Sequence, residues 1–353
     1  MLDDRGSTLT IPTRPLTAHE DPEAEGPTRI LSGRIAILVT ALAAGLSLYA
    51  LYWVIGIIQP QVYRVSFLLL TLVLTFLVFP AHPRWRGQVM WLDWVLVGAT
   101  LLALAWPIID FDQFVYRAAT PLAIDLALGA LTTILVLEAT RRTVGPILPV
   151  TALSFLLYGY YGPSLELIGL DLFAHRGYDI DRLIGTLYMT LEGSFGVPLN
   201  VAATFIVLFT IFGSILAHSG AGQFFITWTM SAFGRSHSGA GPGRTVTLSG
   251  FLLGTVSGSG VATTVTLGAV AWPLLRRAGF TPEVGGGILS ASGIGAILAP
   301  PTMGAAAFLI AEFLQITYLQ VIIMAIIPAV LYYLSIVLMI CLLYTSPSPR
   351  DRG

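Results

Sequence analysis

Residues 244–277 read RTVTLSGFLLGTVSGSGVATTVTLGAVAWPLLRR, an apolar stretch with arginines at both ends and Ser257-Gly258-Ser259-Gly260 in its middle. A helix of about 30 residues is ~45 Å long at ~1.5 Å of rise per residue, whereas the hydrocarbon core of a bilayer is ~30 Å thick. The length, the basic ends and the central break favour a helical hairpin that enters the membrane and returns to the same face. Two full crossings, or one strongly tilted helix, are the alternatives. Broken helices of this kind are where secondary transporters build substrate and ion sites.

The composition is that of an integral membrane protein. Of the 353 residues, 55% are hydrophobic and only 10% are charged, whereas about a quarter of the residues in a soluble domain are charged. The net charge of −1 points to no particular class of partner, and we expect no nucleic-acid partner. Cys341 is the only cysteine, so neither a disulfide framework nor a cysteine-ligated metal site is expected.

Long apolar runs predict an all-α, multi-span bundle. The expected spans cover residues 34–58, 65–79, 89–109, 122–139, 144–161, 197–217 and 318–343. The segments between them are expected to be an interfacial stretch at 111–120, an acidic connection at 162–196, a short surface helix at 220–233 and a Gly- and Ser-rich loop at 235–243. A Gly-rich apolar run, residues 284–314, follows the hairpin.

The placement of arginines predicts the orientation. Basic side chains concentrate in every second connection when the N-terminus is cytoplasmic, at Arg29, Arg34, Arg84, Arg86, Arg141, Arg142, Arg235 and Arg244. The positive-inside rule therefore makes the hairpin re-enter from the cytoplasmic face.

The two ends differ in composition from the spans. Residues 1–33 are polar and predict a disordered cytoplasmic tail. Residues 344–353 follow the last apolar run abruptly, and Cys341 to Asp351 resembles a translated sequencing adapter. We therefore expect a non-native tail on a C-terminally truncated chain, with a natural short polar tail as the alternative.

The Ser257–Gly260 motif has the composition of an ion site. Glycine permits irregular backbone angles, which free carbonyl oxygens from the helical hydrogen-bond ladder. Serine and threonine hydroxyls add neutral oxygens, at Ser257, Ser259, Thr263, Thr264 and Thr266. Such a cluster suits Na⁺, and the N-terminus of the second half-helix favours a substrate carboxylate. Packing of helices through small residues is the alternative.

A second break follows directly. Residues 285–304 contain Gly285-Gly286-Gly287, then SASGIG from Ser290, then Pro300-Pro301-Thr302-Met303-Gly304. Two consecutive prolines remove backbone donors, so no helix runs through them undisturbed. Two successive discontinuous segments favour a transporter, and a kinked packing helix is the alternative.

Four acids fall in or near apolar segments, where charge is costly. Asp93 and Asp125 lie near span ends and are expected to form an interfacial or an interspan hydrogen bond. Glu138 is expected to pair with Arg141 and Arg142. Glu312 remains open between partner binding, gating and a structural role.

Other chemistries find little support. The histidines, His19, His82, His175, His218 and His237, have no metal-ligand spacing and are expected to be structural or solvated. The segment Gly239–Arg244 lacks the Gly-Lys-Ser/Thr ending of a P-loop, so an ion gradient rather than ATP is the expected energy source. An intramembrane enzyme would need a nucleophile–base or acid pair within the spans, and the sequence offers none at helical spacing, so we expect no catalytic residues. A purely structural scaffold remains possible for the first four spans alone.

Three stretches carry a family resemblance. Residues 255–262, TVSGSGVA, followed by Gly268 and Pro273, resemble the first hairpin of the large permease subunit of tripartite ATP-independent periplasmic (TRAP) transporters. APPTMGAAAF from Ala299, followed by Ala311-Glu312, resembles the element after that hairpin. Residues 137–145, LEATRRTVG, resemble the junction of the fused permeases, which pair with a TAXI-class solute-binding protein.

The resemblance implies a sodium-coupled importer of organic acids that works as an elevator in the bacterial inner membrane. It implies a static small-subunit-like scaffold at 34–160, a periplasmic connection at 161–196 and the first half of the transport domain at 197–343. It carries over the sodium and substrate residues Ser257, Gly258, Ser259 and Gly260, with Thr263 beside them and Ser257 and Ser259 as Na⁺ candidates. Pro300, Pro301, Thr302 and Gly304 then line the facing break, and no cofactor other than Na⁺ is expected.

The chain departs from the family pattern at several points. Thr263 stands where many members have Asn, and Gly295-Ala296-Ile297 where many have Gly-Gly-Gln, so the substrate is expected to be less polar than a small dicarboxylate. The family's large subunit has two inverted halves, each with a hairpin, and the resemblance covers only the first, so we expect the second half and its hairpin to be missing from this chain. The alternative within transport is an ion-coupled anion symporter that needs no binding protein.

Overall fold

The protein is an all-α bundle, described here by a computed structural model that covers residues 28–29, 31–169, 171–233 and 241–345. Within these ranges no strand occurs, and six helices are long and apolar enough to cross a membrane. They are Gly33–Ile55, Pro60–Val78, Trp91–Ile109, Ala123–Thr143, Val197–Ile215 and Tyr318–Leu342. The predicted membrane fold is confirmed. Nearly all of the expected tails, residues 1–27 and 346–353, lie outside the described residues.

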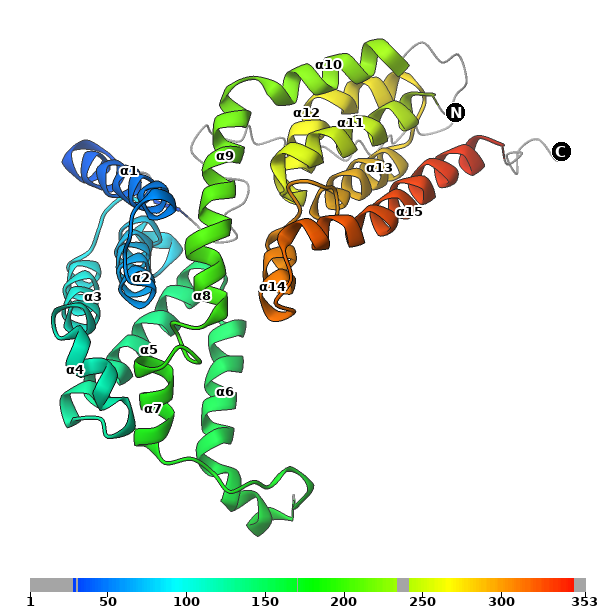
Figure 1. Ribbon diagram of the computed structural model, residues 1–353. Helices are drawn as coiled ribbons and strands as arrows, with labels where there is room; N and C mark the ends of the chain where they lie inside the picture. Colours follow the sequence, from blue (N-terminus) through cyan, green and yellow to red (C-terminus); the bar gives the residue numbers. More distant parts are fainter. Residues whose placement is uncertain (1–27, 30, 170, 234–240, 346–353) are drawn as a thin grey trace, which may run out of the picture.

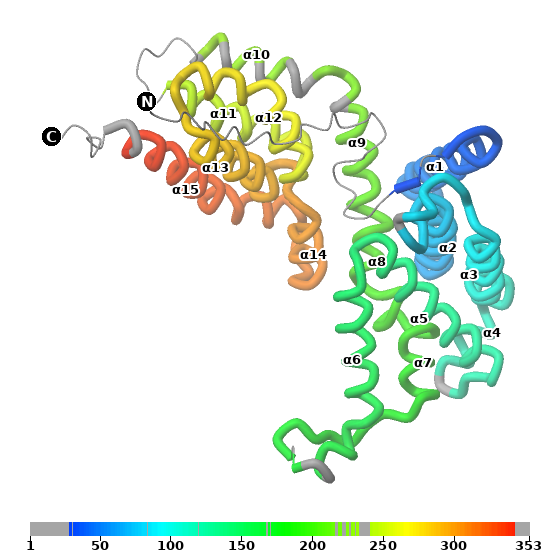
Figure 2. Tube along the Cα trace, turned by 180° about the vertical axis from the view of Figure 1, so that it is seen from behind, coloured from blue at the N-terminus to red at the C-terminus, as the bar shows by residue number. Residues whose placement is uncertain are grey.

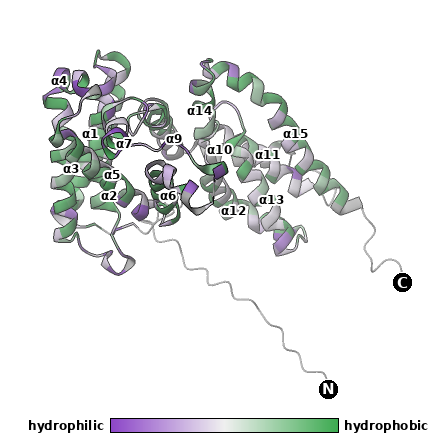
Figure 3. Ribbon diagram, turned by 90° about the horizontal axis from the view of Figure 1, so that it is seen from below, coloured by the Kyte–Doolittle hydropathy of each residue, from purple (hydrophilic) through white to green (hydrophobic). Residues whose placement is uncertain are grey.

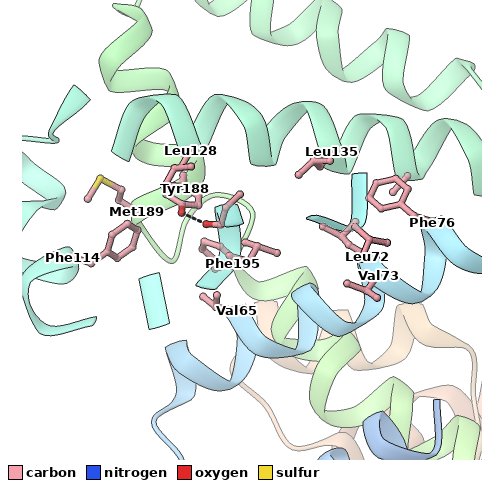
Figure 4. Packing of buried hydrophobic residues seen from close by; sticks show 14 of the residues in the cluster. Val65, Leu72, Val73, Phe76, Phe114, Leu128, Leu135, Tyr188, Met189 and Phe195 are labelled. Carbon is pink, nitrogen blue, oxygen red and sulfur yellow. Dashed lines mark hydrogen bonds between the residues drawn. The ribbon is translucent and has the colours of Figure 1, made fainter. Parts of the chain in front are cut away.

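The first lobe comprises the helices before residue 190. It contains α1 Gly33–Ile55, α2 Pro60–Val78, α3 Trp91–Ile109, α4 Phe111–Tyr116, α5 Ala123–Thr143, α6 Ile147–Tyr161 and α7 Ile180–Met189. Side chains of α2, α5 and α7 meet in a buried apolar cluster, which includes Leu72, Phe76, Leu135 and Tyr188 (Figure 4). The helix α7 lies within the acidic connection, which the sequence had indicated only as a linking segment, and it packs against α5.

The turn between α5 and α6 shifts the boundary that was predicted between the spans at 122–139 and 144–161. The helix α5 continues through both arginines to Thr143, and Gly145 then adopts φ +98 before Pro146. A glycine with positive φ past the last helical residue is a common way to end a helix. The following helix, α6, therefore begins only at Ile147, and its 15 residues fall short of the length expected for a full span.

Buried charges join α3, α5 and the segment that precedes α1. Arg29 Nη2 donates to Asp93 at 2.5 Å and Arg142 Nη1 donates to the other oxygen of the same carboxylate at 2.7 Å. These three side chains are buried. Glu138 pairs with Arg141 at 2.7 Å and with Arg142 at 2.8 Å. The expected interspan contact of Asp93 and the local pairing of Glu138 are both confirmed.

Asp125 likewise bonds between elements. It accepts a hydrogen bond from Trp106 Nε1 of α3 at 2.9 Å and from Arg117 Nε at 3.2 Å. Arg117, which lies outside the spans, also donates to Asp110 at 2.8 Å. Hydrogen bonds to these two carboxylates raise the pKa of Arg117, because they stabilise the charged guanidinium. The predicted interspan role of Asp125 is confirmed.

The second lobe contains the broken segments. It is built from α10 Ala221–Phe233, α11 Gly241–Ser257, α12 Gly260–Arg277, α13 Pro282–Ile294, the 3-10 turn η6 Gly295–Ile297, α14 Ala305–Phe313 and α15 Tyr318–Thr345. The expected helix at 220–233 is present as α10. The expected loop at 235–243 is wrong at its end, because residues 241–243 already form the first turn of α11; residues 234–240 lie outside the described part. Proline at the second position of a helix needs no N–H partner, so the turn forms readily.

One helix stands between the two lobes, as Figures 1 and 2 show from opposite sides. It consists of α8 Val197–Val201, the π-helical segment η5 Ala202–Ile206 and α9 Val207–His218. Its neighbours are α1 and α2 of the first lobe and α11 and α14 of the second. Hydrophobic residues cover much of the outward faces of the helices (Figure 3), as lipid contact requires.

Candidate functional site

The central break of the 244–277 stretch is a tight turn between two packed helices. The helix α11 ends at Ser257, Gly258 adopts φ +62, and α12 begins at Gly260. Ser259 caps α12, because its Oγ accepts a hydrogen bond from the backbone N–H of Ala262 at 3.3 Å. The two helices pack along each other. The stretch is therefore not an unbroken rod.

The open ends of α11 and α12 lie together. A Cβ placed on Gly243, in the first turn of α11, would lie 3.1 Å from the ring of Phe280, which follows the end of α12. The ends of both helices belong to one buried apolar cluster, which also includes Ile288. The chain thus forms a hairpin, with its basic ends on one side and the Gly-Ser turn at its tip.

The second break begins where α13 ends. The turn η6 follows, then a cis peptide bond between Pro300 and Pro301, and α14 begins only after Gly304. Tyr318 of α15 donates a hydrogen bond from its hydroxyl to the carbonyl of Pro301 at 2.7 Å. The predicted interruption of the helix at the two prolines is confirmed.

The two breaks contact each other. Thr302 Oγ1 donates to the carbonyl of Thr255 at 2.7 Å and lies 3.4 Å from the carbonyl of Gly254, in the last turns of α11. Both carbonyls lie at the end of α11, where backbone acceptors lack partners within the helix, and the carbonyl of Gly254 also accepts the amide of Gly258 at 3.1 Å. At Gly258 the carbonyl of Thr302 approaches so closely that it leaves no room for a Cβ. Residues 47 positions apart thereby form one junction, called here the tip junction.

Hydroxyl groups cluster inside the hairpin tip. Ser257 Oγ lies 2.5 Å from Thr263 Oγ1, and it is within hydrogen-bonding distance of the carbonyl and the amide of Ser259, at 3.1 and 3.2 Å. Thr263 is fully buried, so it faces the interior of the hairpin rather than open space. The structure therefore brings together three of the predicted residues, Ser257, Ser259 and Thr263, with Thr263 farther inside the hairpin than the two serines.

An open groove of about 570 Å³ lies between the hairpin tip and the second break. Three of the predicted tip residues line it, Gly258, Ser259 and Gly260, together with Gly304 from the second break. Pro300, Pro301 and Thr302 precede Gly304 in the second break but are not among the residues that line the groove. Thr264, one of the hydroxyl residues of the motif, also lines it, and the remaining lining residues are Val261, Val265, Ser290, Ile294, Ile297 and Ala305.

The electrostatic character of the groove comes from the backbone. The lining residues carry no charged side chain, but both Gly260 and Ala305, the first residues of α12 and α14, are among them. The first four N–H groups of a helix have no partner within the helix, and the helix dipole adds partial positive charge there. The groove can therefore receive an anionic group without a basic side chain.

Glu312, whose role the sequence left open, has a partner far along the chain. Asn200 Nδ2 of α8 lies 3.4 Å from Glu312 Oε1 near the end of α14. Asn200 in turn accepts a hydrogen bond from Arg64 Nε of α2 at 3.1 Å. Sequence reasoning missed Asn200 and Arg64 as partners of Glu312, because no spacing along the chain relates the three.

The histidines within the described ranges make local backbone contacts. His82 Nδ1 accepts from the amide of Arg84 at 3.2 Å, His175 Nδ1 accepts from the amide of Gly177 at 3.0 Å, and His218 contacts the carbonyl of Ser214. His19 and His237 lie outside those ranges. No group of three or more potential metal-binding His, Cys, Asp or Glu side chains occurs in the part that the structure describes.

Comparison with known proteins agrees with these features. A model of the family described as "Tripartite ATP-independent periplasmic transporter, DctM component" matches residues 131–349, which extend from α5 through the entire second lobe. No curated protein and no solved structure matches the chain. Because the family match spans well over half of the 353 residues and contains both broken segments, this chain belongs to the DctM component family of the TRAP transporters.

Proposed function

We propose that this permease imports organic acids across the bacterial inner membrane, driven by a sodium gradient. Family membership makes the chain a multi-pass permease of a TRAP-type secondary transporter, and such transporters work with a periplasmic binding protein. The observation that carries the rest of the proposal is the convergence of two broken helices on one groove. This arrangement is the one in which secondary transporters bind substrate and coupling ion.

The starts of α12 and α14 support a carboxylate substrate. Both Gly260 and Ala305 border the groove, so the free N–H groups of two helices are near the same space. An anionic group at a helix N-terminus is stabilised by hydrogen bonds and by the helix dipole. Binding through backbone groups also avoids placing a permanently charged arginine or lysine within the membrane.

The apolar wall of the groove supports a substrate with a hydrophobic body. Val261, Val265, Ile294 and Ile297 all line the space beside the two helix starts. A second carboxylate there would lose hydration without gaining a partner, which is costly. A monocarboxylate is therefore favoured over a small dicarboxylate.

The oxygens at the hairpin tip support Na⁺ as the coupling ion. Ser257 Oγ, Ser259 Oγ and the carbonyl of Ser259 lie within two residues of each other around the positive-φ glycine. Hard cations prefer oxygen ligands, and these oxygens are neutral, which suits a monovalent rather than a divalent ion. Ser257 and Ser259 are the residues that would hold the ion.

Replacing Ser259 with alanine is predicted to weaken the sodium dependence of uptake. The change removes one oxygen ligand and the cap of α12, and we expect the sodium concentration for half-maximal uptake to rise about tenfold, equivalent to ~1.4 kcal/mol. The measurement is substrate uptake into proteoliposomes as a function of external sodium. Ser154→Ala on α6 is the matched control, because Ser154 Oγ bonds only within its own helix turn, to Val150 O. An unchanged sodium dependence in Ser259→Ala would exclude an ion role for this serine.

The membrane orientation of the hairpin is testable by cysteine labelling. Arg244 and Arg277 are exposed at the open ends of α11 and α12. In a Cys341→Ser background, cysteines at either position are expected to react with a membrane-impermeant thiol reagent only from the cytoplasmic side. The same reagent added to right-side-out and inside-out vesicles makes the comparison. Labelling of the two positions from opposite sides would show that residues 244–277 cross the membrane.

The partner is proposed to be a binding protein of the TAXI class. The junction sequence at 137–145 supports this choice, and in the structure it is the continuous C-terminal part of α5 followed by the Gly145 turn. Uptake by the reconstituted permease is expected to require the purified binding protein. Full uptake of free substrate without it would instead identify an ion-coupled symporter that works alone.

A further inference from the structure

One end of the first lobe carries several arginines. At this end α2 ends, α3 begins and α5 ends, and the segment before α1 lies against them, because the amide of Arg29 donates to the carbonyl of Val78 at 2.9 Å. Four exposed arginines of this end are called here the arginine cluster. They are Arg34 in the first turn of α1, Arg84 and Arg86 in the connection between α2 and α3, and Arg141 near the end of α5.

Two hydrogen bonds hold the end of α5 against the connection between α2 and α3. Arg141 Nη2 donates to the carbonyl of Ala81 at 3.2 Å, and Arg142 Nη1 donates to the carbonyl of Phe79 at 3.2 Å. Ala81 precedes Arg84 by only three residues. Arginines from two separate elements therefore share one short stretch of surface.

The charges packed behind the arginine cluster do not cancel. Arg29, Arg141 and Arg142 share two carboxylates, those of Asp93 and Glu138, so three positive charges meet two negative ones. Two buried nitrogens, Arg29 Nε and Arg142 Nη2, have no hydrogen-bond partner within the part of the chain that the structure describes. The excess positive charge adds to the potential of the exposed arginines, because a low-dielectric interior screens it weakly.

The opposite end of the first lobe has no such excess. There Arg117 lies between two carboxylates, at 2.8 Å from Asp110 and 3.2 Å from Asp125. The acidic connection at 162–196, which leads into α7, carries two arginines and five carboxylates. An anionic surface is therefore attracted to the arginine cluster and not to the other end.

Exposed tryptophans surround the arginine cluster. Trp85 lies between Arg84 and Arg86 in the chain and is 43% exposed, and at the start of α3 Trp91 is 72% and Trp94 44% exposed. Tryptophan is enriched where a membrane protein meets the lipid headgroups. The cluster thus lies at the level of the phospholipid phosphates, which long arginine side chains can reach.

We propose that the arginine cluster binds the headgroup of an anionic phospholipid, such as phosphatidylglycerol. A guanidinium group can donate two parallel hydrogen bonds to a phosphate while keeping its charge. The acyl chains would pack on the apolar surface beside the tryptophans, which a soluble phosphate cannot do. The orientation predicted from the arginines places this site in the cytoplasmic leaflet, where basic clusters beside transmembrane helices attract anionic lipids.

Native mass spectrometry of the purified permease in a non-ionic detergent tests the proposal by measuring the binding of single lipids. The test variant carries Arg84→Gln with Arg86→Gln. The matched control carries Arg176→Gln with Arg182→Gln, two exposed arginines of the acidic connection and of α7. We expect the dissociation constant for phosphatidylglycerol to rise about 30-fold in the test variant, equivalent to ~2 kcal/mol, and to stay unchanged in the control. Phosphatidylcholine, which has no net charge, is expected to bind all three proteins alike.

Thermal unfolding supplies a second readout, because a lipid that binds the folded protein stabilises it. Phosphatidylglycerol is expected to raise the unfolding temperature of the wild type and the control more than that of the test variant. A variant with Arg84→Lys and Arg86→Lys keeps both charges but loses the forked donors, so its affinity should lie between those of the wild type and the test variant.

Three results would overturn the proposal. The first is equal affinity of the wild type and the test variant for phosphatidylglycerol. The second is displacement of the lipid by an equimolar amount of inorganic phosphate, which would identify a site for a free anion. The third is lipid binding that appears only after the four carboxylates of residues 20–25, EDPEAE, are replaced with amides, which would show that the chain's own tail covers the arginines. None of these measurements depends on the transported substrate.

Discussion

Replacing Gly258 with alanine is expected to abolish uptake and to destabilise the second lobe. Gly258 adopts φ +62, where a side chain costs about 1 kcal/mol or more. The new Cβ would also collide with the carbonyl oxygen of Thr302, a backbone atom that cannot rotate away. Overpacking of this kind costs about 1–3 kcal/mol. The tip junction must then open, and the hydrogen bond from Thr302 to Thr255 is lost with it.

The measurement is thermal unfolding of the purified permease in detergent, combined with uptake in proteoliposomes. Gly286→Ala is the matched control, because Gly286 lies within α13, its φ is not in the left-handed region, and a Cβ there would meet nothing within 4 Å. Alanine is favoured over glycine in a helix by about 1 kcal/mol, so the control is expected to be neutral or slightly stabilising. If Gly258→Ala matched the control in both assays, the tip junction would be required neither for stability nor for uptake.

Replacing Asp93 with alanine is expected to destabilise the first lobe more than any other single charge removal there. The carboxylate binds Arg29 through one oxygen and Arg142 through the other, and all three groups are buried. Its loss leaves Arg29 in the interior with only neutral backbone carbonyls of α2 as acceptors, while Arg142 keeps Glu138 and one backbone carbonyl. Breaking a buried ion pair by removing one partner costs about 3–5 kcal/mol. Asp93 also accepts the amide of Met90 at 2.9 Å, so the start of α3 loses its cap.

Unfolding in increasing denaturant, followed by tryptophan fluorescence, measures this loss. Asp112→Ala removes an exposed carboxylate from the first turn of α4 and is the control, with an expected change within about 0.5 kcal/mol. Asp93→Asn keeps an acceptor for the amide of Met90 but removes the charge. Its free energy of unfolding should therefore lie between those of Asp93→Ala and Asp112→Ala. Equal stability of Asp93→Ala and Asp112→Ala would show that the arginines find other partners.

Local sequence features predict most of the long helices and both of the breaks in the second lobe. Long apolar runs predict spans because a backbone in lipid must satisfy its own hydrogen bonds, and a helix does so within one segment. The interruptions at Gly258 and at Pro300-Pro301 follow from local chemistry as well, since glycine permits positive φ and proline lacks a donor. The ion pair of Glu138 with Arg141 and Arg142 is equally local, because residues three and four apart share a helix face.

Which of these helices and breaks contact one another depends on tertiary packing. Hydropathy and spacing carry no information on partners far apart in the chain, so neither the bond from Thr302 to Thr255 nor the contact of Tyr63 with the carbonyl of Ala203 could be predicted. The groove has the same origin: its glycines were recognised from the motif, but Ile294 and Ile297 join them only because α13 packs against both arms of the hairpin. Apolar surface drives burial without direction, and close packing of specific side chains, here around glycines that let backbones approach, selects the partners.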